Sequence, residues 1–97
     1  MSTLNDEALQ QLAAQVGAVL VQRGLMLASA ESCTGGWLGQ TMTSVAGSST
    51  WYERGFITYT NISKSEMLGV SDATLAQYGA VSEQTAKEMA LGTLARS

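Results

Sequence analysis

The sequence contains no histidine, and this absence excludes several kinds of active site within the chain. A Ser-His-Asp triad, a Cys-His pair and a His-ligated metal centre all require that side chain. The single cysteine, Cys33, can form neither an internal disulfide nor a zinc ribbon. If the protein is an enzyme, its base must therefore be Lys, Asp, Glu or Tyr, or must come from another chain.

Basic residues and long apolar runs are also scarce. The chain has 5 Lys and Arg against 8 Asp and Glu, a net charge of −3, and its basic residues are scattered. A nucleic-acid-binding surface usually shows clustered Lys and Arg, so we expect no nucleic-acid partner. No run approaches the roughly 18–20 apolar residues of a membrane span, and the N-terminal residues lack the basic and apolar regions of a signal peptide. We therefore expect no membrane partner and a cytoplasmic location.

No internal repeat, low-complexity segment or Pro-rich linker divides the 97 residues, so we expect a single domain over residues 1–97. Residues 5–23 are predicted to form an amphipathic helix, because apolar side chains recur there at three- and four-residue spacing. Asn5 is the expected N-cap of this helix, and Gly24 is its expected C-terminal stop.

Two strands and a helix are predicted in the middle of the chain. The segment 25–32 favours a short strand, and 34–45 favours a helix whose glycines weaken it. The β-branched and aromatic run "GFITYT", residues 55–60, is the clearest strand pattern in the sequence.

Capping signals predict three further helices. Ser63 and Glu66 have the spacing of a capping box, so a short helix should begin at Lys64 and end near Gly69. Ser71 and Ser82 are the expected N-caps of the last two helices. Helices that alternate with two strands indicate an α/β fold in which layered helices cover a small sheet.

The stretch "ESCTGG" concentrates polar and small side chains between a predicted strand and a predicted helix. Amides at the helix start and the hydroxyls of Ser32 and Thr34 could hold an anion such as a phosphate. Gly35 and Gly36 would let a ligand approach the backbone closely. The alternative is a capped strand-to-helix turn without a ligand. A lone cysteine with no visible base is more often a small buried residue, so Cys33 is expected to pack inward.

Ser48, Tyr59 and Lys64 form a second candidate constellation. Without histidine a serine nucleophile needs another base, and Ser-Lys arrangements are a known solution. A lysine in the first turn of a helix faces the positive end of the helix dipole, and residues that break a local rule often mark function. Tyr59 could relay a proton or orient the lysine. A turn serine, a strand aromatic and a solvated surface lysine are the alternative interpretation.

Taken together, these segments resemble the CinA C-terminal domain / PncC family, where CinA is competence/damage-inducible protein A. The resemblance rests on "AESCTGG" (30–36), "AGSS" (46–49) with "WYERGFITYTN" (51–61), the lysine at 64, "LGV" (68–70) and "GAVSE" (79–83). These motifs occur in the family's order and spacing and cover nearly the whole chain.

The resemblance implies hydrolysis of the amide of nicotinamide mononucleotide to nicotinic acid mononucleotide and ammonia. It implies Ser48 as the nucleophile, activated by Lys64 with Tyr59 assisting. It also implies that "ESCTGG" lines the substrate pocket, and no metal or organic cofactor is implied. The pocket residues would be Glu31, Ser32, Thr34, Gly35 and Gly36.

Members of that family run roughly half as long again as this chain. Their later portion carries a Gly-rich loop, further strands and an arginine for the phosphate, so the resemblance is to the N-terminal part of the domain. The alternative function is therefore a catalytically incomplete piece that binds a nucleotide or anion, or that self-associates. Apolar surface along Phe56, Ile57 and the last helix favours a homo-oligomer.

Overall fold

The chain forms five α-helices, one 3₁₀ helix and two strands over residues 5–97, the part of the chain that the computed structural model describes. Residues 1–4 of the predicted domain lie outside the described residues. In chain order the elements are α1 (Asp6–Arg23), β1 (Leu27–Glu31), α2 (Trp37–Thr43), η1 (Ser48–Thr50), β2 (Tyr52–Ile57), α3 (Asn61–Leu68), α4 (Asp72–Tyr78) and α5 (Glu83–Arg96).

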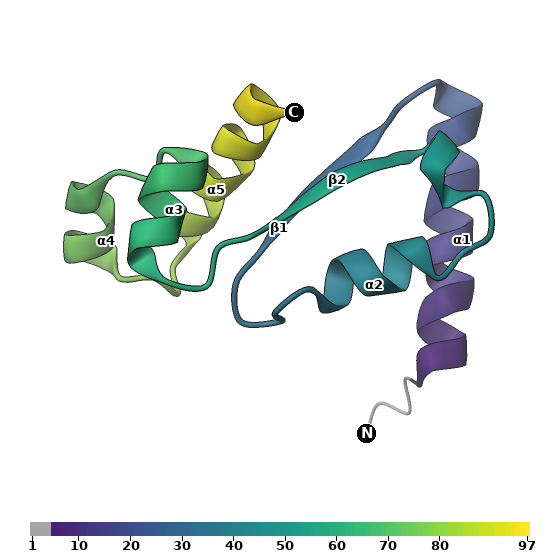
Figure 1. The fold of residues 1–97 in the computed structure, drawn as a ribbon, viewed down its shortest axis with the longest axis horizontal. Helices are drawn as coiled ribbons and strands as arrows, with labels where there is room; N and C mark the ends of the chain where they lie inside the picture. The colour runs from purple at the N-terminus through teal and green to yellow at the C-terminus, as the bar shows by residue number, and fades with distance from the viewer. Residues whose placement is uncertain (1–4) are drawn as a thin grey trace.

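The two strands form a parallel sheet that links two groups of helices (Figure 1). The helices α3, α4 and α5 gather at one end of the sheet, and α1 lies at the other end with η1 beside it. The described part of the chain measures 39 × 35 × 17 Å along its principal axes, so it is flat. This architecture confirms the predicted α/β class with helices layered on a small sheet.

Local capping chemistry explains where most helices begin. The Asn5 side chain accepts a hydrogen bond from Ala8 N, and Gly24 ends α1 in a left-handed conformation, as predicted. The Ser71 and Ser82 hydroxyls cap α4 and α5 in the same manner, by accepting from Thr74 N and Thr85 N. Both of these predicted N-caps are confirmed.

The predicted start of α3 is wrong by three residues. The cap is Thr60, whose Oγ1 accepts from Ser63 N, so the helix begins at Asn61 and not at Lys64. Lys64 is therefore the fourth helical residue, and its amide already bonds to the Thr60 carbonyl. The helix ends at Leu68 and is capped by Gly69, close to the predicted end.

The second strand also begins earlier than predicted, at Tyr52 and not at Gly55. The strand pairs with β1 along its length, from Leu27 opposite Tyr52 to Glu31 opposite Ile57, with one irregularity between Leu27 and Ala28. The stretch 53–55 is exposed, so it lacks the apolar pattern by which a strand is recognised. Pairing with the neighbouring strand, and not local sequence, sets this boundary.

A small core lies where α3, α4 and α5 meet the sheet. Leu68, Val70 and Met89 are its buried centre, and the half-buried side chains of Ala30 and Phe56 pack against it from the two strands. At the other end of the sheet, Trp51 is buried against α1, where a side chain at Gly17 would overlap the indole ring. Both packing sites flank the sheet and hold its ends in place.

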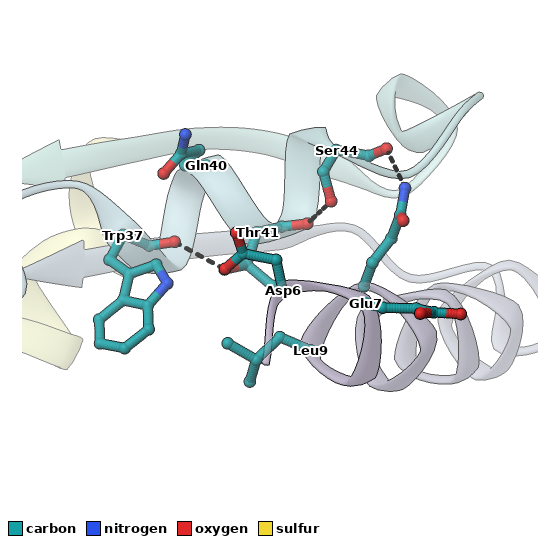
Figure 2. Close-up of a pocket in the computed structure, with 8 residues that line it drawn as sticks. Asp6, Glu7, Leu9, Trp37, Gln40, Thr41 and Ser44 are labelled. Carbon is teal, nitrogen blue, oxygen red and sulfur yellow. Dashed lines mark hydrogen bonds between the residues drawn. The ribbon is translucent and has the colours of Figure 1, made fainter. Parts of the chain in front are cut away.

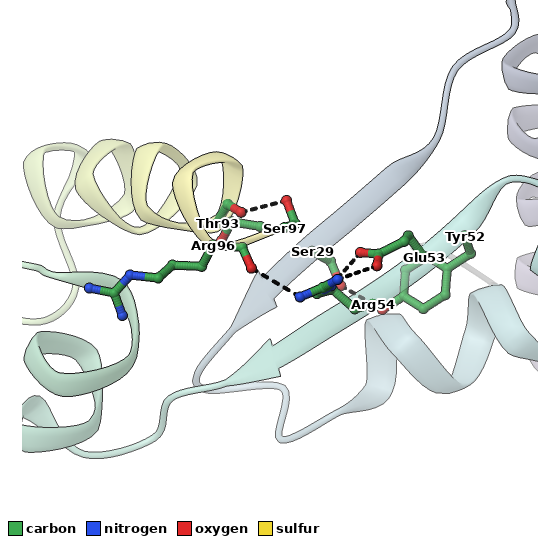
Figure 3. A network of polar contacts seen from close by, with 7 residues as sticks. All are labelled: Ser29, Tyr52, Glu53, Arg54, Thr93, Arg96 and Ser97. Atoms are coloured by element: carbon green, nitrogen blue, oxygen red, sulfur yellow. Dashed lines mark hydrogen bonds and ion pairs between the residues drawn. The ribbon is translucent and has the colours of Figure 1, made fainter.

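Polar bonds tie the strands to each other and to α5 (Figure 3). The Ser29 and Tyr52 hydroxyls lie 2.7 Å apart across the two strands. Arg54 pairs with the adjacent Glu53 and donates to the Arg96 carbonyl at 3.0 Å. No helix among the described residues is both long and apolar enough to cross a membrane.

Candidate active site

The carboxyl ends of the two parallel strands place two distant segments side by side. Glu31 lies opposite Ile57, and Thr58 N donates to the Glu31 carbonyl at 2.9 Å. The next residue of the first segment is Ser32, and the second segment continues through Tyr59 into α3. Ligands of α/β proteins bind beyond this end of the strands, which makes it the first place to look for chemistry.

Lys64 reaches back from α3 to this edge of the sheet. Its side chain is only 1% exposed, and Nζ donates to three oxygens: the Thr58 carbonyl at 3.0 Å, the Tyr59 carbonyl at 3.0 Å and Ser32 Oγ at 3.1 Å. Within residues 5–97 the only salt bridge joins Arg54 to Glu53, so no carboxylate pairs with Lys64. A buried lysine held by neutral oxygens alone is costly unless each N–H has a partner, and here each has one.

The Ser32 hydroxyl is the one side-chain partner among these three oxygens. A serine hydroxyl within hydrogen-bond reach of a lysine amine is the arrangement that a Ser-Lys nucleophile requires. The structure therefore joins Ser32 to Lys64.

The structure does not bring Ser48 to Lys64. Ser48 is the first residue of η1, which precedes β2, whereas Lys64 Nζ lies beyond the other end of that strand. A strand of this length spans roughly 20 Å at about 3.3 Å per residue. Ser48 is buried, and within one chain this arrangement offers no contact between it and Lys64, so the activation of Ser48 by Lys64 stays a prediction.

Tyr59 lies at the predicted place but contributes a different group. Its carbonyl accepts from Lys64 Nζ, while its side chain is 72% exposed and its hydroxyl makes no hydrogen bond with the described residues. A relay role for the phenol stays a prediction.

Glu31 holds the start of α2. Its carboxylate is 7% exposed and accepts from Thr34 Oγ1 at 2.6 Å, Leu38 N at 2.9 Å and Gly39 N at 3.0 Å. Burial alone would raise the pKa of this carboxyl, but the bonds from Thr34 and from the backbone amides outweigh burial and hold its pKa below the ordinary glutamate value. A carboxylate at a helix N-terminus is also favoured by the dipole.

This arrangement bears on the two interpretations of "ESCTGG". The amides of Leu38 and Gly39 at the start of α2 are bonded to Glu31, so the stretch includes a capped strand-to-helix turn. Gly35 and Gly36 have φ of 62° and 110°, a region that favours glycine, and they turn the chain into α2. Cys33 is exposed, so the expectation that it packs inward is wrong. Substrate contacts of these residues stay predictions.

Two grooves separate α2 from α1. One is a polar groove of about 310 Å³ that contains Gln10, whose Nε2 donates to the Ser44 carbonyl at 2.8 Å, and Trp37 stands at its edge (Figure 2). The other is apolar, about 340 Å³, and includes Thr34 among side chains such as Leu12 and Val16. These side chains belong to the apolar stripe predicted for the first helix, so much of that stripe is open.

The pairing of Ser32 with Lys64 was not predicted, although the sequence held a signal for it. Two successive strands joined by a helix run parallel, so their carboxyl ends meet at one edge of the sheet. The residues that follow them, Ser32 and Thr58 to Lys64, then become neighbours. The family resemblance implies Ser48 as the nucleophile instead.

Comparison with known proteins agrees with this fold and covers nearly the whole chain. A model of the CinA C-terminal domain family matches residues 9–97. The nicotinamide-nucleotide amidohydrolase PncC of Escherichia coli (strain K12) is 54% identical over 91 residues, 94% of this chain and 55% of that protein. A CinA-like protein of Acaryochloris marina is 53% identical over 88 residues, 91% of this chain and 20% of that protein.

Solved structures give the same result. The competence/damage inducible protein of Agrobacterium tumefaciens superposes with a TM-score of 0.90 at 48% identity, over 100% of this chain and 58% of that one. A CinA superfamily protein of Escherichia coli superposes with a TM-score of 0.92 at 34% identity, over 100% of this chain and 56% of that one. The chain thus spans about half the length of the PncC relatives that it matches.

Proposed function

The chain belongs to the CinA C-terminal domain family, and from this premise we propose that it carries the nucleophile and base of an amidohydrolase acting on nicotinamide mononucleotide. The substrate class comes from the PncC relatives, which are nicotinamide-nucleotide amidohydrolases. The observation that carries the proposal is the buried Lys64 Nζ at 3.1 Å from Ser32 Oγ.

In the proposed reaction Ser32 is the nucleophile, in place of Ser48. Ser32 Oγ attacks the carboxamide carbon while its proton passes to the neutral Lys64 amine. The tetrahedral intermediate then collapses, the C–N bond breaks, and Lys64 returns the proton so that ammonia leaves. Lys64 then takes a proton from water, and the hydroxide attacks the acyl carbon. The bond from that carbon to Ser32 Oγ breaks, Lys64 returns the proton to Ser32 Oγ, and the carboxylic acid leaves.

Backbone amides next to Ser32 are the proposed donors to the oxyanion. The amides of Cys33 and Thr34 bond to no backbone carbonyl among residues 5–97, unlike that of Gly35, which donates to the Ser32 carbonyl. An amide one residue after a nucleophile is well placed for this task, and removal of one such donor typically costs about 10²–10³ in rate.

Ammonia release from nicotinamide mononucleotide tests the proposal. We expect Ser32→Ala and Lys64→Met to abolish release, and Ser48→Ala to retain it. Lys87→Met is the matched control, because Lys87 is the chain's other lysine and is exposed on α5. Loss of release with Ser48→Ala and not with Ser32→Ala would instead support Ser48. Absence of release from the wild-type chain would refute activity in these residues alone.

The phenol of Tyr59 needs a separate variant. Because only its carbonyl contacts Lys64, Tyr59→Phe should leave ammonia release close to the wild-type rate. A large loss would assign the hydroxyl a direct role in proton transfer or substrate contact.

A further inference from the structure

Glu31 is held on both sides at the point where the chain leaves the sheet. Its carbonyl accepts from Thr58 N on β2, and its carboxylate accepts from Thr34 and from the first turn of α2. The five residues 32–36 between these anchors form the turn that carries Ser32. The Glu31 carboxylate therefore fixes the end of the turn to α2. The Glu31 carbonyl fixes the start of the turn to Thr58, in the segment that leads to Lys64.

We infer that Glu31 is the positioning residue that holds Ser32 Oγ against Lys64 Nζ, and that it acts through the turn and not by contact with substrate. This inference rests on the proposed function and extends it to a residue outside the reacting pair. Its carboxylate is buried and bonded to three donors, so it faces the protein and not the open side of the site.

The hydroxyl of Thr34 contributes to the same positioning of the turn, because it is bonded to the Glu31 carboxylate. Thr34 Oγ1 donates to Glu31 Oε1 at 2.6 Å, a short bond of the charge-assisted kind, and it lies in the middle of the turn. Serine at this position keeps the donor, whereas valine removes it. Glutamine in place of Glu31 keeps the shape but offers the Gly39 amide an NH₂ group where it needs an acceptor.

A second glutamate provides a matched control elsewhere in the fold. Glu88 on α5 also accepts from a backbone amide, Ser71 N at 2.9 Å, and from a threonine hydroxyl, that of Thr74, at the start of α4. Its chemistry is that of Glu31, but no residue of the turn 32–36 takes part. Glu88→Gln therefore reproduces the loss of a carboxylate cap without touching the proposed site.

The test measures how accessible Lys64 is. The wild-type chain and the variants Glu31→Gln, Thr34→Val, Thr34→Ser and Glu88→Gln are reductively methylated with formaldehyde and a borane, well below their melting temperatures. Peptide mass spectrometry then follows Lys64 and Lys87 separately. In the wild type Lys64 should react slowly because its amine is buried and bonded three times, whereas exposed Lys87 provides the internal reference.

We expect Lys64 methylation to rise at least tenfold in Glu31→Gln and several-fold in Thr34→Val. Thr34→Ser and Glu88→Gln should match the wild type, and Lys87 should not change. Unchanged Lys64 methylation in Glu31→Gln would overturn the inference. An equal rise of Lys64 methylation in Glu88→Gln would also overturn the inference, because a general loss of stability would then explain the rise in Glu31→Gln.

Ammonia release separates this inference from the function on which it rests. If the wild-type chain is active, Glu31→Gln should lower kcat at least tenfold with little change in KM, and a raised KM at unchanged kcat would contradict positioning. If the wild-type chain releases no ammonia while Lys64 methylation still depends on Glu31, the proposed function fails and the positioning of Ser32 against Lys64 stands.

Discussion

At the scale of single residues, Thr58 combines full burial with an unused hydroxyl. It is 0% exposed, and its Oγ1 has no hydrogen-bond partner among the residues that the structure describes. A buried hydroxyl without a hydrogen-bond partner destabilises the folded state and lowers the free energy of unfolding by roughly 1–3 kcal/mol. Because its backbone carbonyl and not its side chain contacts Lys64, the hydroxyl can be removed without touching the Ser32–Lys64 pair.

Thr58→Val should therefore raise the free energy of unfolding by about 1 kcal/mol, measured by urea denaturation. Thr85→Val is the matched control: Thr85 is equally buried, but its hydroxyl donates to the Gly79 carbonyl at 2.7 Å. The free energy of unfolding of Thr85→Val should fall by about 1 kcal/mol. If both variants lose stability alike, Thr58 Oγ1 has a hydrogen-bond partner in solution and its burial carries no penalty.

Glu31 gives the stability of the chain a defined dependence on pH. Its folded-state pKa lies below that of an unfolded glutamate, so the unfolded chain binds a proton more readily as the pH falls. The stabilisation is fully present above the unfolded value, about 4.3, and is lost as the pH falls through the folded one.

The difference in free energy of unfolding between wild type and Glu31→Gln should thus be constant from pH 7 to about 6. It should shrink steadily below about pH 5, as denaturant titrations at each pH would measure. A difference that stays the same down to pH 3 would show that the carboxylate charge contributes nothing.

At the scale of elements, the sequence predicted helices better than strands, because caps are local. Asn5 and Gly24 bound α1, and Ser71 starts α4, by contacts within three or four residues. The start of α3 was predicted wrongly because two nearby hydroxyl residues, Thr60 and Ser63, can each cap a helix. The hydroxyl of Thr60 supplies the cap. The start of β2 was missed because pairing with β1 sets it.

The crossing of α5 over α3 depends on one small residue. A Cβ at Gly92 would lie 1.9 Å from the Leu68 carbonyl oxygen and 2.9 Å from Leu68 Cβ. The clash is with backbone, which cannot rotate away, so the two helices would have to separate and loosen the core around Val70 and Met89.

Gly92→Ala should lower the free energy of unfolding by about 2–3 kcal/mol, although alanine is the better helix former. Urea denaturation against Lys87→Ala, an exposed change on the same helix, measures the effect. The control should stay within about 0.5 kcal/mol of the wild type. A gain in stability for Gly92→Ala would show that the crossing is looser than described.

At the scale of the whole molecule, the site arises from topology. Ser32 and Lys64 lie 32 positions apart in the chain and meet only because both strands end at the same edge of the sheet. The sequence could identify the residue types and the strand-end location, but not which serine reaches the lysine. The parallel register, which local sequence does not reveal, brings Ser32 to the lysine.

The overall shape also leaves apolar surface uncovered. A parallel sheet is normally covered on both faces, yet a groove of about 390 Å³ runs between β1 and α5. Leu94, one of the residues that line this groove, is 73% exposed, and Met26, which also lines it, is exposed. Exposed apolar patches can mark surfaces that associate.

We therefore predict that the chain self-associates through this groove, with a second copy as the occupant. The sedimentation coefficient should rise with protein concentration, and Leu94→Lys should hold the chain as a monomer, because a charge in an apolar contact is costly to bury. Gln84→Lys adds the same charge at an exposed polar position of α5 and should associate like the wild type. A wild-type chain that sediments as a monomer at every concentration would remove the groove as an interface between copies.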